Sequence, residues 1–157
     1  MAEQDFEELL RLFNKYRVRY CIVGAYAVAF HARPRYTKDI DFLVKPSIEN
    51  GRKIVIALED FGFNALKLTS KDFTKSKRFI QLGYEPVRID LITSISGCSF
   101  EQIWKHRVRG RYGREQAWFI GLRELIRNKR LSGRPQDKAD IEILTPYKNS
   151  KKTKRRR

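Results

Sequence analysis

The chain has 157 residues, 41% of them hydrophobic and 33% charged, which fits one soluble globular domain with enough apolar material for a core. No apolar run reaches the roughly 20 residues of a membrane-spanning helix, and the N-terminus lacks the pattern of a signal peptide. The two cysteines lack metal-ligand spacing and indicate reduced thiols in a cytoplasmic protein. The composition therefore argues against a membrane protein.

The net charge is strongly positive, at +16 from 34 basic and 18 acidic residues. The segment 148–157 holds seven of the basic residues, so residues 1–147 keep an excess of nine. We expect one folded domain over 1–147 and a basic disordered tail over 148–157. Such a surface attracts polyanions, of which nucleic acid is the commonest, and the alternative is a charge that only keeps the protein soluble.

The first elements follow from hydrophobic spacing. Apolar residues between Phe6 and Phe13 recur at helical spacing and predict an amphipathic helix that packs on a sheet. An apolar strand over Val18–Val23 follows, and Gly24 then allows a tight turn into an alanine-rich helix that Pro34 ends. The N-terminus of that helix is a natural phosphate site, because its backbone N–H groups and its dipole attract anions.

The rest of the chain alternates short helices and strands. The predicted elements are a helix from Pro46 to Gly62, strands over 78–84 and 87–93, a helix over 99–106, a strand over 115–120, and helices over 122–130 and 137–144. The basic segment 107–114 is either a mobile contact for RNA or phosphate or a solvated hairpin. We expect His31 to pack or cap a helix end and Trp118 to lie in the core. Together these elements predict an α+β fold with a mixed β-sheet flanked by helices.

Two acidic residues stand at the start of the apolar strand that runs to Val44. Asp39 and Asp41 project from one face of this strand, and Ile40 and Phe42 from the other, because the side chains of a strand alternate. Two carboxylates this close repel each other, and a divalent cation removes that conflict. Mg²⁺ in particular prefers one or two carboxylates together with substrate phosphates.

Asp90 lies in a similar apolar setting, within the predicted strand over 87–93. A carboxylate inside such a strand is costly unless it faces the same metal site. Opposed residues on neighbouring strands lie roughly 5 Å apart at Cβ, so three carboxylates could hold two ions roughly 3.5–4 Å apart. The alternative for any acid-x-acid pair is a solvated face, and the same spacing recurs at Asp140/Glu142.

These residues also form a longer motif, which continues downstream over 88–94, 97–101, 125–129 and 133–140. Its first part consists of Gly24, Ala27, His31, Ala32, Arg35, Thr37, Asp39, Ile40 and Asp41. The pattern resembles the nucleotidyltransferase superfamily that includes DNA polymerase β and the tRNA CCA-adding enzymes. It is most similar to the small prokaryotic nucleotidyltransferases of the AbiEii type, over roughly residues 15 to 145.

The resemblance implies a metal-dependent enzyme that moves a nucleoside monophosphate from a nucleoside triphosphate, such as ATP, to a hydroxyl acceptor. Asp39, Asp41 and Asp90 would bind Mg²⁺ or Mn²⁺ and carry the catalysis. The acceptor would be RNA, such as tRNA, or a protein, as in toxin–antitoxin systems, and a protein partner is possible. The residues implied in nucleotide binding are Gly24, Ala25, Arg35, Thr37, Lys129 and Asp137.

Some alternatives stay open at this point. Ala25 stands where members of the superfamily usually have Gly or Ser, which favours a protein that keeps the fold without turnover and acts as a nucleic-acid-binding or antitoxin-like partner. Asp137 could instead cap the last helix, and Asp140 could pair with Lys129 or Arg35. A small-molecule acceptor such as an aminoglycoside is disfavoured, because such a cation would be repelled by this positive chain.

Overall fold

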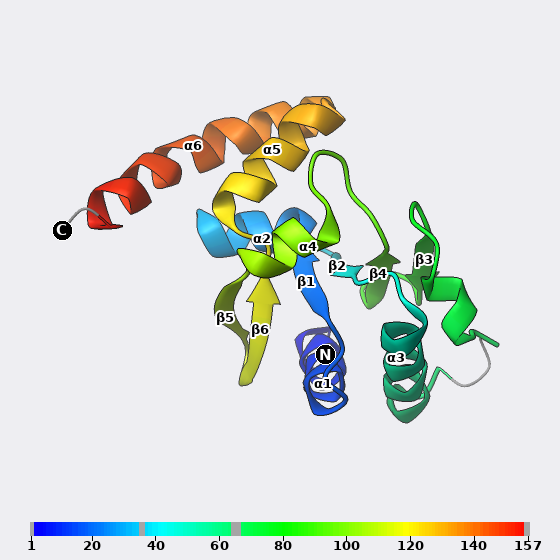
Figure 1. Ribbon diagram of the computed structural model, residues 1–157. Coiled ribbons are helices and arrows are strands. Elements are labelled where there is room, and N and C mark those ends of the chain that lie inside the picture. The colour runs from blue at the N-terminus through cyan, green and yellow to red at the C-terminus, as the bar shows by residue number, and fades with distance from the viewer. Residues whose placement is uncertain (1, 35–36, 64–66, 156–157) are drawn as a thin grey trace.

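Six strands and six α-helices make up the computed structural model, which describes residues 2–34, 37–63 and 67–155, with side chains over 4–148 (Figure 1). The helices are α1 (Ala2–Lys15), α2 (Gly24–His31), α3 (Ile48–Phe61), α4 (Phe100–Lys105), α5 (Leu122–Ser132) and α6 (Pro135–Arg155), with a 3₁₀ turn η2 (Ser70–Phe73). The strands are β1 (Tyr20–Val23), β2 (Asp39–Val44), β3 (Phe79–Leu82), β4 (Arg88–Ile92), β5 (Val108–Tyr112) and β6 (Glu115–Phe119).

The strands form one mixed sheet in the order β3-β4-β2-β1-β6-β5. Strand β1 pairs antiparallel with β2 and parallel with β6, while β2 pairs parallel with β4. The outer pairs β3–β4 and β5–β6 are antiparallel. Helix α1 packs against α3 and β6, and α2 packs against β1, β2, α5 and α6. The predicted α+β architecture, a mixed sheet flanked by helices, is confirmed.

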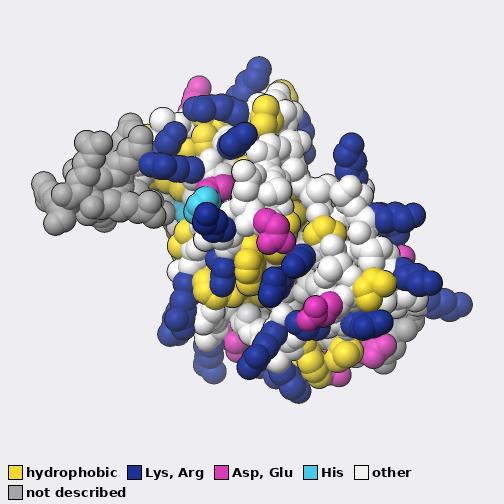
Figure 2. Space-filling model, viewed as in Figure 1, with side chains coloured by type: hydrophobic (Ala, Val, Ile, Leu, Met, Phe, Trp, Pro, Cys, Tyr) yellow, Lys and Arg dark blue, Asp and Glu magenta, His cyan; other side chains and the backbone are white. Residues whose placement is uncertain are grey.

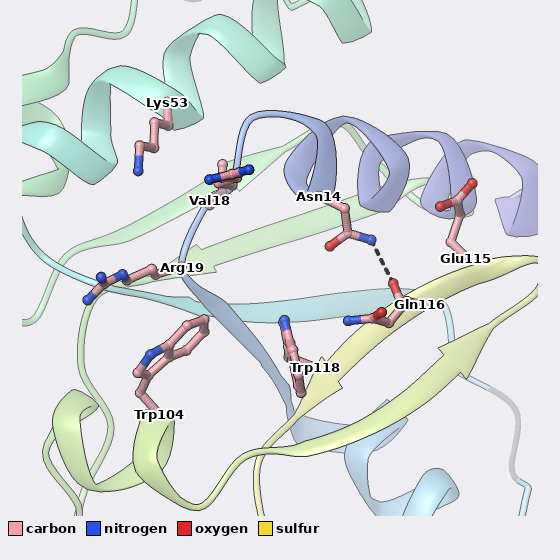
Figure 3. Close-up of a pocket in the computed structure, with 9 residues that line it drawn as sticks. Asn14, Val18, Arg19, Lys53, Trp104, Glu115, Gln116 and Trp118 are labelled. Carbon is pink, nitrogen blue, oxygen red and sulfur yellow. Dashed lines mark hydrogen bonds between the residues drawn. The ribbon is translucent and has the colours of Figure 1, made fainter.

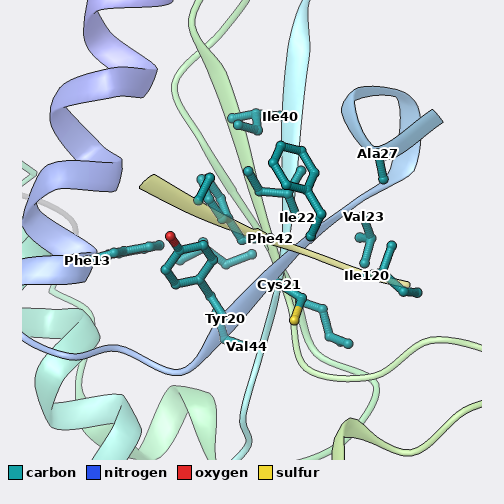
Figure 4. Packing of buried hydrophobic residues seen from close by; sticks show 14 of the residues in the cluster. Phe13, Tyr20, Cys21, Ile22, Val23, Ala27, Ile40, Phe42, Val44 and Ile120 are labelled. Carbon is teal, nitrogen blue, oxygen red and sulfur yellow. The ribbon is translucent and has the colours of Figure 1, made fainter. Parts of the chain in front are cut away.

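The alternation of side chains in β1 and β2 builds the core (Figure 4). Ile22 lies opposite Phe42 in the antiparallel ladder. The Phe42 ring contacts Phe13 of α1 and Tyr20, with centroids 5.2 Å and 5.6 Å apart. All four side chains are buried, as is Ile40 on the same face of β2. Because this face packs against α1, the opposite face of β2 carries Asp39 and Asp41.

Two segments differ from their simplest prediction. The basic segment after Arg107 is strand β5, which forms a hairpin with β6 from Val108↔Phe119 to Tyr112↔Glu115. Its contact with RNA or phosphate stays a prediction. Helix α6 runs from Pro135 to Arg155, further than the predicted 137–144, and Figure 1 shows its C-terminal part projecting from the rest of the fold. A domain limit at 147 and disorder over 148–157 stay predictions.

Across the described ranges, no helix is long and apolar enough to cross a membrane.

Candidate active site

Three carboxylates converge on one face of the paired strands β2 and β4. The parallel register places Asp41 directly beside Asp90 and Asp39 beside Arg88. Each of the three aspartates offers an oxygen, and these oxygens all lie within 4.8 Å of one another. The sequence predicted this convergence from two separate segments, and the geometry confirms it.

The cluster combines burial with like charges. Asp90 is 2% exposed, while Asp39 and Asp41 are half-buried. Burial, the charge of Asp39 and the neighbouring Asp90 raise the pKa of Asp41 from 3.8 to about 7. Three oxygen donors that cannot easily all be ionised together fit a hard divalent cation, which would remove the repulsion. The residues that would hold it are Asp39, Asp41 and Asp90.

Gly24 sits directly against this cluster, because Val23 is the ladder partner of Asp41. Its φ is +70°, and a Cβ built on it would overlap Asp41 Oδ2 and lie 3.1 Å from Asp41 Cγ. Gly24 also begins α2, so the free N–H groups of the first turn, including that of Ala25, lie next to the carboxylates. A helix N-terminus beside a cation site is a place where a phosphate group would be held from both sides.

Two further side chains support individual aspartates. Thr37 Oγ1 donates to the backbone oxygen of Asp39 at 3.1 Å and to its Oδ1 at 3.4 Å. Arg88 Nε donates to Asp90 Oδ1 at 3.1 Å. Thr37 was predicted at the site, whereas Arg88 was not assigned a role. The contact could have been predicted from the sequence. Residues i and i+2 of a strand share a face, so Arg88 lies beside Asp90.

Lys129 lies in a buried ionic cluster between α5 and α6. It is 6% exposed, and its Nζ donates to Asp140 Oδ2 at 2.8 Å and to Asp137 Oδ1 at 3.4 Å. The pairing of Asp140 with Lys129, one of the alternatives from the sequence, is therefore observed. In this arrangement the Lys129 charge is matched by two aspartates, and its predicted role toward a triphosphate stays a prediction.

Asp137 stabilises the N-terminus of α6 by hydrogen bonds. Its Oδ2 accepts from Ser132 Oγ at 2.6 Å and from the backbone N–H of Arg134 at 3.2 Å, which is the capping role left open by the sequence. Although burial alone raises the pKa of Asp137, the hydrogen bonds from the Ser132 and Arg134 side chains and the charges of Lys129 and Arg134 bring that pKa below its usual range. Asp137 is thus held as a carboxylate within the fold, and its predicted part in nucleotide binding stays a prediction.

Arg134 is a cation that the sequence did not single out. Its side chain is 76% exposed, and its Nε donates to Asp137 Oδ2 at 3.0 Å. The hydrogen bond and charge of Asp137, together with the negative charge of Asp41, raise the pKa of Arg134. The guanidinium is thus an exposed cation at the start of α6, held by Asp137. Its only signal in the sequence was its position in the segment 133–140.

His31 and Arg35 are the two remaining residues to which the sequence assigned a role. His31 is buried and its Nε2 donates to the backbone oxygen of Ile120 at 2.6 Å, so it packs the end of α2 as expected. Arg35, predicted to hold phosphate, lies outside the described residues.

Comparisons with known proteins agree with this fold. A scan against protein-family models finds no matching family, and a search of the curated proteins finds no match. Among solved structures, the chain is similar to an antigenic nucleotidyltransferase-like protein from Paracoccidioides brasiliensis. The TM-score is 0.56, and the match covers 92% of this chain and 75% of that chain at 14% identity.

At this level of identity the similarity establishes the fold. The chain therefore has a nucleotidyltransferase-like fold, with a cluster of three aspartates at the end of β1 where α2 begins.

Proposed function

We propose that the protein is a metal-dependent nucleotidyltransferase that moves a nucleoside monophosphate from a nucleoside triphosphate to a hydroxyl acceptor. The observation that carries the proposal is the convergence of Asp39, Asp41 and Asp90 beside the N-terminus of α2. The nucleotidyltransferase-like fold supports it. The specific likeness to AbiEii-type enzymes rests on the sequence motif and belongs to the proposal.

The residues divide the work between position and charge. Asp39, Asp41 and Asp90 would hold Mg²⁺ or Mn²⁺, which when bound would neutralise phosphate charge and favour the deprotonated form of the acceptor hydroxyl. The N–H groups at Gly24 and Ala25 orient the triphosphate, and Arg134 is placed to meet its charge. The acceptor oxygen bonds to the α-phosphorus, the bond from that phosphorus to the bridging oxygen breaks, pyrophosphate leaves and the hydroxyl proton is released.

RNA is the acceptor that we favour over a protein. The chain carries a net charge of +16, and Figure 2 shows Lys and Arg side chains across the whole face in view. Arg109 and Arg111 are exposed on β5, one of the two edge strands of the described sheet. Cations spread along a surface favour a phosphate backbone over a single acidic group. A role in a toxin–antitoxin system belongs to the same proposal.

The test is label transfer from each α-³²P nucleoside triphosphate, with Mg²⁺ or Mn²⁺, to total RNA or to lysate protein. We expect label on RNA, and none with the double variant Asp39→Ala/Asp41→Ala. The matched control is Glu8→Ala/Glu142→Ala, which removes two exposed carboxylates, one from α1 and one from α6. Transfer that persists in the Asp39/Asp41 double variant would exclude the proposed site.

A second candidate is a protein that keeps the fold without turnover and binds nucleic acid as an antitoxin-like partner. Ala25 in the first turn of α2 favours it, since alanine has no hydroxyl to offer a phosphate. An RNA-binding measurement beside the transfer assay separates the two candidates. RNA binding without label transfer, with either Mg²⁺ or Mn²⁺ present, would support the protein that binds nucleic acid without turnover.

A further inference from the structure

A pocket of about 640 Å³ lies at the end of β1 opposite the carboxylate cluster. Val18 and Arg19 line it and precede Tyr20 at the start of β1, whereas Gly24 follows the end of that strand. The strand has four residues, which corresponds to a rise of about 13 Å. The pocket is therefore separate from the site proposed for nucleotidyl transfer.

Both tryptophans of the chain line this pocket. Trp104 comes from α4 and Trp118 from β6, and their ring centroids are 6.3 Å apart. Trp118, predicted as a core residue, packs against the core but is only partly buried. Trp104 is also stacked on Phe100, with centroids 5.8 Å apart, so the pocket presents the uncovered parts of the two indoles.

One cation, Arg107, contacts both indole rings. The Arg107 guanidinium carbon lies 3.8 Å from the Trp104 ring centroid and 4.3 Å from that of Trp118. Arg107 Nη1 also donates to the Trp104 backbone oxygen at 2.7 Å. Because a guanidinium is attracted to both rings and is also hydrogen-bonded to the backbone, it holds both indoles in place before any ligand binds.

Positive side chains surround the rings. Arg17 and Arg19 are exposed and Lys53 is half-buried, and Figure 3 shows Lys53 and Arg19 on the same side of the pocket as Trp104. The Arg19 guanidinium carbon lies 5.8 Å from the Trp104 ring centroid. Glu115 is the acidic residue in the lining, so three cations stand against one carboxylate.

Hydrogen-bonding groups of Asn14, Gln116 and Glu115 lie across the pocket from Lys53 and Arg19 (Figure 3). Asn14 Nδ2 donates to the backbone oxygen of Gln116 at 2.8 Å, and Asn14 Oδ1 accepts from the Tyr20 hydroxyl at 2.9 Å. The side chains of Gln116 and Glu115 offer hydrogen-bond donors and acceptors to the pocket. Such groups suit the polar edge of a flat ring.

We propose that this pocket binds a nucleotide, either free or as one unit of single-stranded RNA. The base packs against the indoles of Trp104 and Trp118, and the phosphate meets Arg19, Lys53 and Arg17. A nucleotide combines a flat ring, a polar ring edge and an anion, whereas an acidic peptide supplies only the anion. The proposal does not depend on the carboxylate site or on any transfer reaction.

Ligand binding can be followed by the intrinsic tryptophan fluorescence of the full chain, because both of its tryptophans line this pocket. The titration uses AMP, UMP and a single-stranded RNA oligonucleotide in EDTA, which removes metal-dependent binding at the aspartates. We expect saturable quenching by the mononucleotides, and tighter quenching by RNA if the pocket serves a strand. Pyrophosphate and polyglutamate carry charge without a base and should leave the fluorescence almost unchanged.

Charge variants locate the binding. Arg19→Gln and Lys53→Gln should each raise the nucleotide concentration needed for half-maximal quenching by about tenfold. The control is Arg52→Gln, which removes an exposed cation that lies next to Lys53 in α3 but does not line the pocket, and it should leave that concentration unchanged. Trp104→Phe and Trp118→Phe apportion the signal between the rings. Absence of saturable quenching, equal quenching by polyglutamate, or indifference to both charge variants would overturn the proposal.

Discussion

The Asp41 carboxylate lies so close to Gly24 that a Cβ on Gly24 would overlap Oδ2, with Asp41 Cγ only 3.1 Å away. The same glycine has a φ of +70°, in the left-handed region that L side chains rarely adopt. Gly24 is therefore required twice, once by the backbone turn into α2 and once by the space that the carboxylate occupies. The turn and the carboxylate site depend on each other.

Gly24→Ala should abolish nucleotidyl transfer and also destabilise the fold, because both the turn and Asp41 must shift. Gly62→Ala is the matched control, since Gly62 also has a positive φ, at +109°, but no atom lies within 4 Å of its added Cβ. The control should lose about 1–2 kcal/mol of unfolding free energy from backbone strain and keep its transfer activity. Urea unfolding and label transfer measure the two effects. Equal losses in both variants would mean that the carboxylate contact is unimportant.

The metal-free protein should become less stable as pH rises from about 4 to 8. Burial and the neighbouring aspartates raise the pKa of Asp41 to about 7 in the folded protein, against roughly 4 in the unfolded chain. The folded state therefore holds a proton that the unfolded state has lost, and this contribution is present at low pH and lost through pH 7. Thermal unfolding in EDTA at several pH values measures it.

Mg²⁺ or Mn²⁺ should reverse that trend, with a stabilisation that grows between pH 6 and 8 as the competing proton leaves. Asp41→Asn removes the ionisable group, so without metal it should be more stable than the parent at pH 8, by on the order of 2 kcal/mol. It should also lose the metal effect. A stabilisation by metal that is unchanged in Asp41→Asn would place the ion elsewhere.

Lys129 tests whether the buried ionic cluster is structural. Lys129→Met leaves Asp137 and Asp140 without their shared cation, and breaking a buried pair from one side typically costs about 3–5 kcal/mol. We expect this loss in urea unfolding. The control is Lys138→Met, which removes an exposed lysine from α6 and should cost less than about 0.5 kcal/mol. A Lys129→Met protein of normal stability with a raised KM for nucleotide would instead support its predicted contact with the triphosphate.

The sequence predicted the parts of the site that depend on short-range periodicity. The alternation that buries Ile40 and Phe42 also sends Asp39 and Asp41 to the other face, and Asp90 follows the same rule in β4. The parallel register that sets Asp41 beside Asp90 joins segments about fifty residues apart. The apolar setting of Asp90 predicted that the three aspartates meet, but not the parallel pairing of β2 and β4 that brings them together. Arg107 could not be foreseen, because its place between two tryptophans from α4 and β6 depends on how the hairpin packs.

Arg134 should contribute to nucleotide binding and little to stability. Its side chain is 76% exposed at the start of α6, a helix that packs against α2, so we expect it to meet the phosphates of a nucleotide bound at the aspartates. Arg134→Gln should raise the KM for nucleoside triphosphate roughly tenfold, because a charge-assisted hydrogen bond is lost. Arg130→Gln, an exposed arginine of α5, is the control and should leave KM unchanged.

The split between KM and stability decides what Arg134 does. Asp137 keeps its bonds to Ser132 and Lys129 when Arg134 is replaced, so the start of α6 should survive and the unfolding free energy should change by less than about 1 kcal/mol. Arg134→Lys retains the charge without the planar fork and should recover part of the affinity. If Arg134→Gln lowered stability by several kcal/mol and left KM unchanged, the arginine would serve only to hold Asp137.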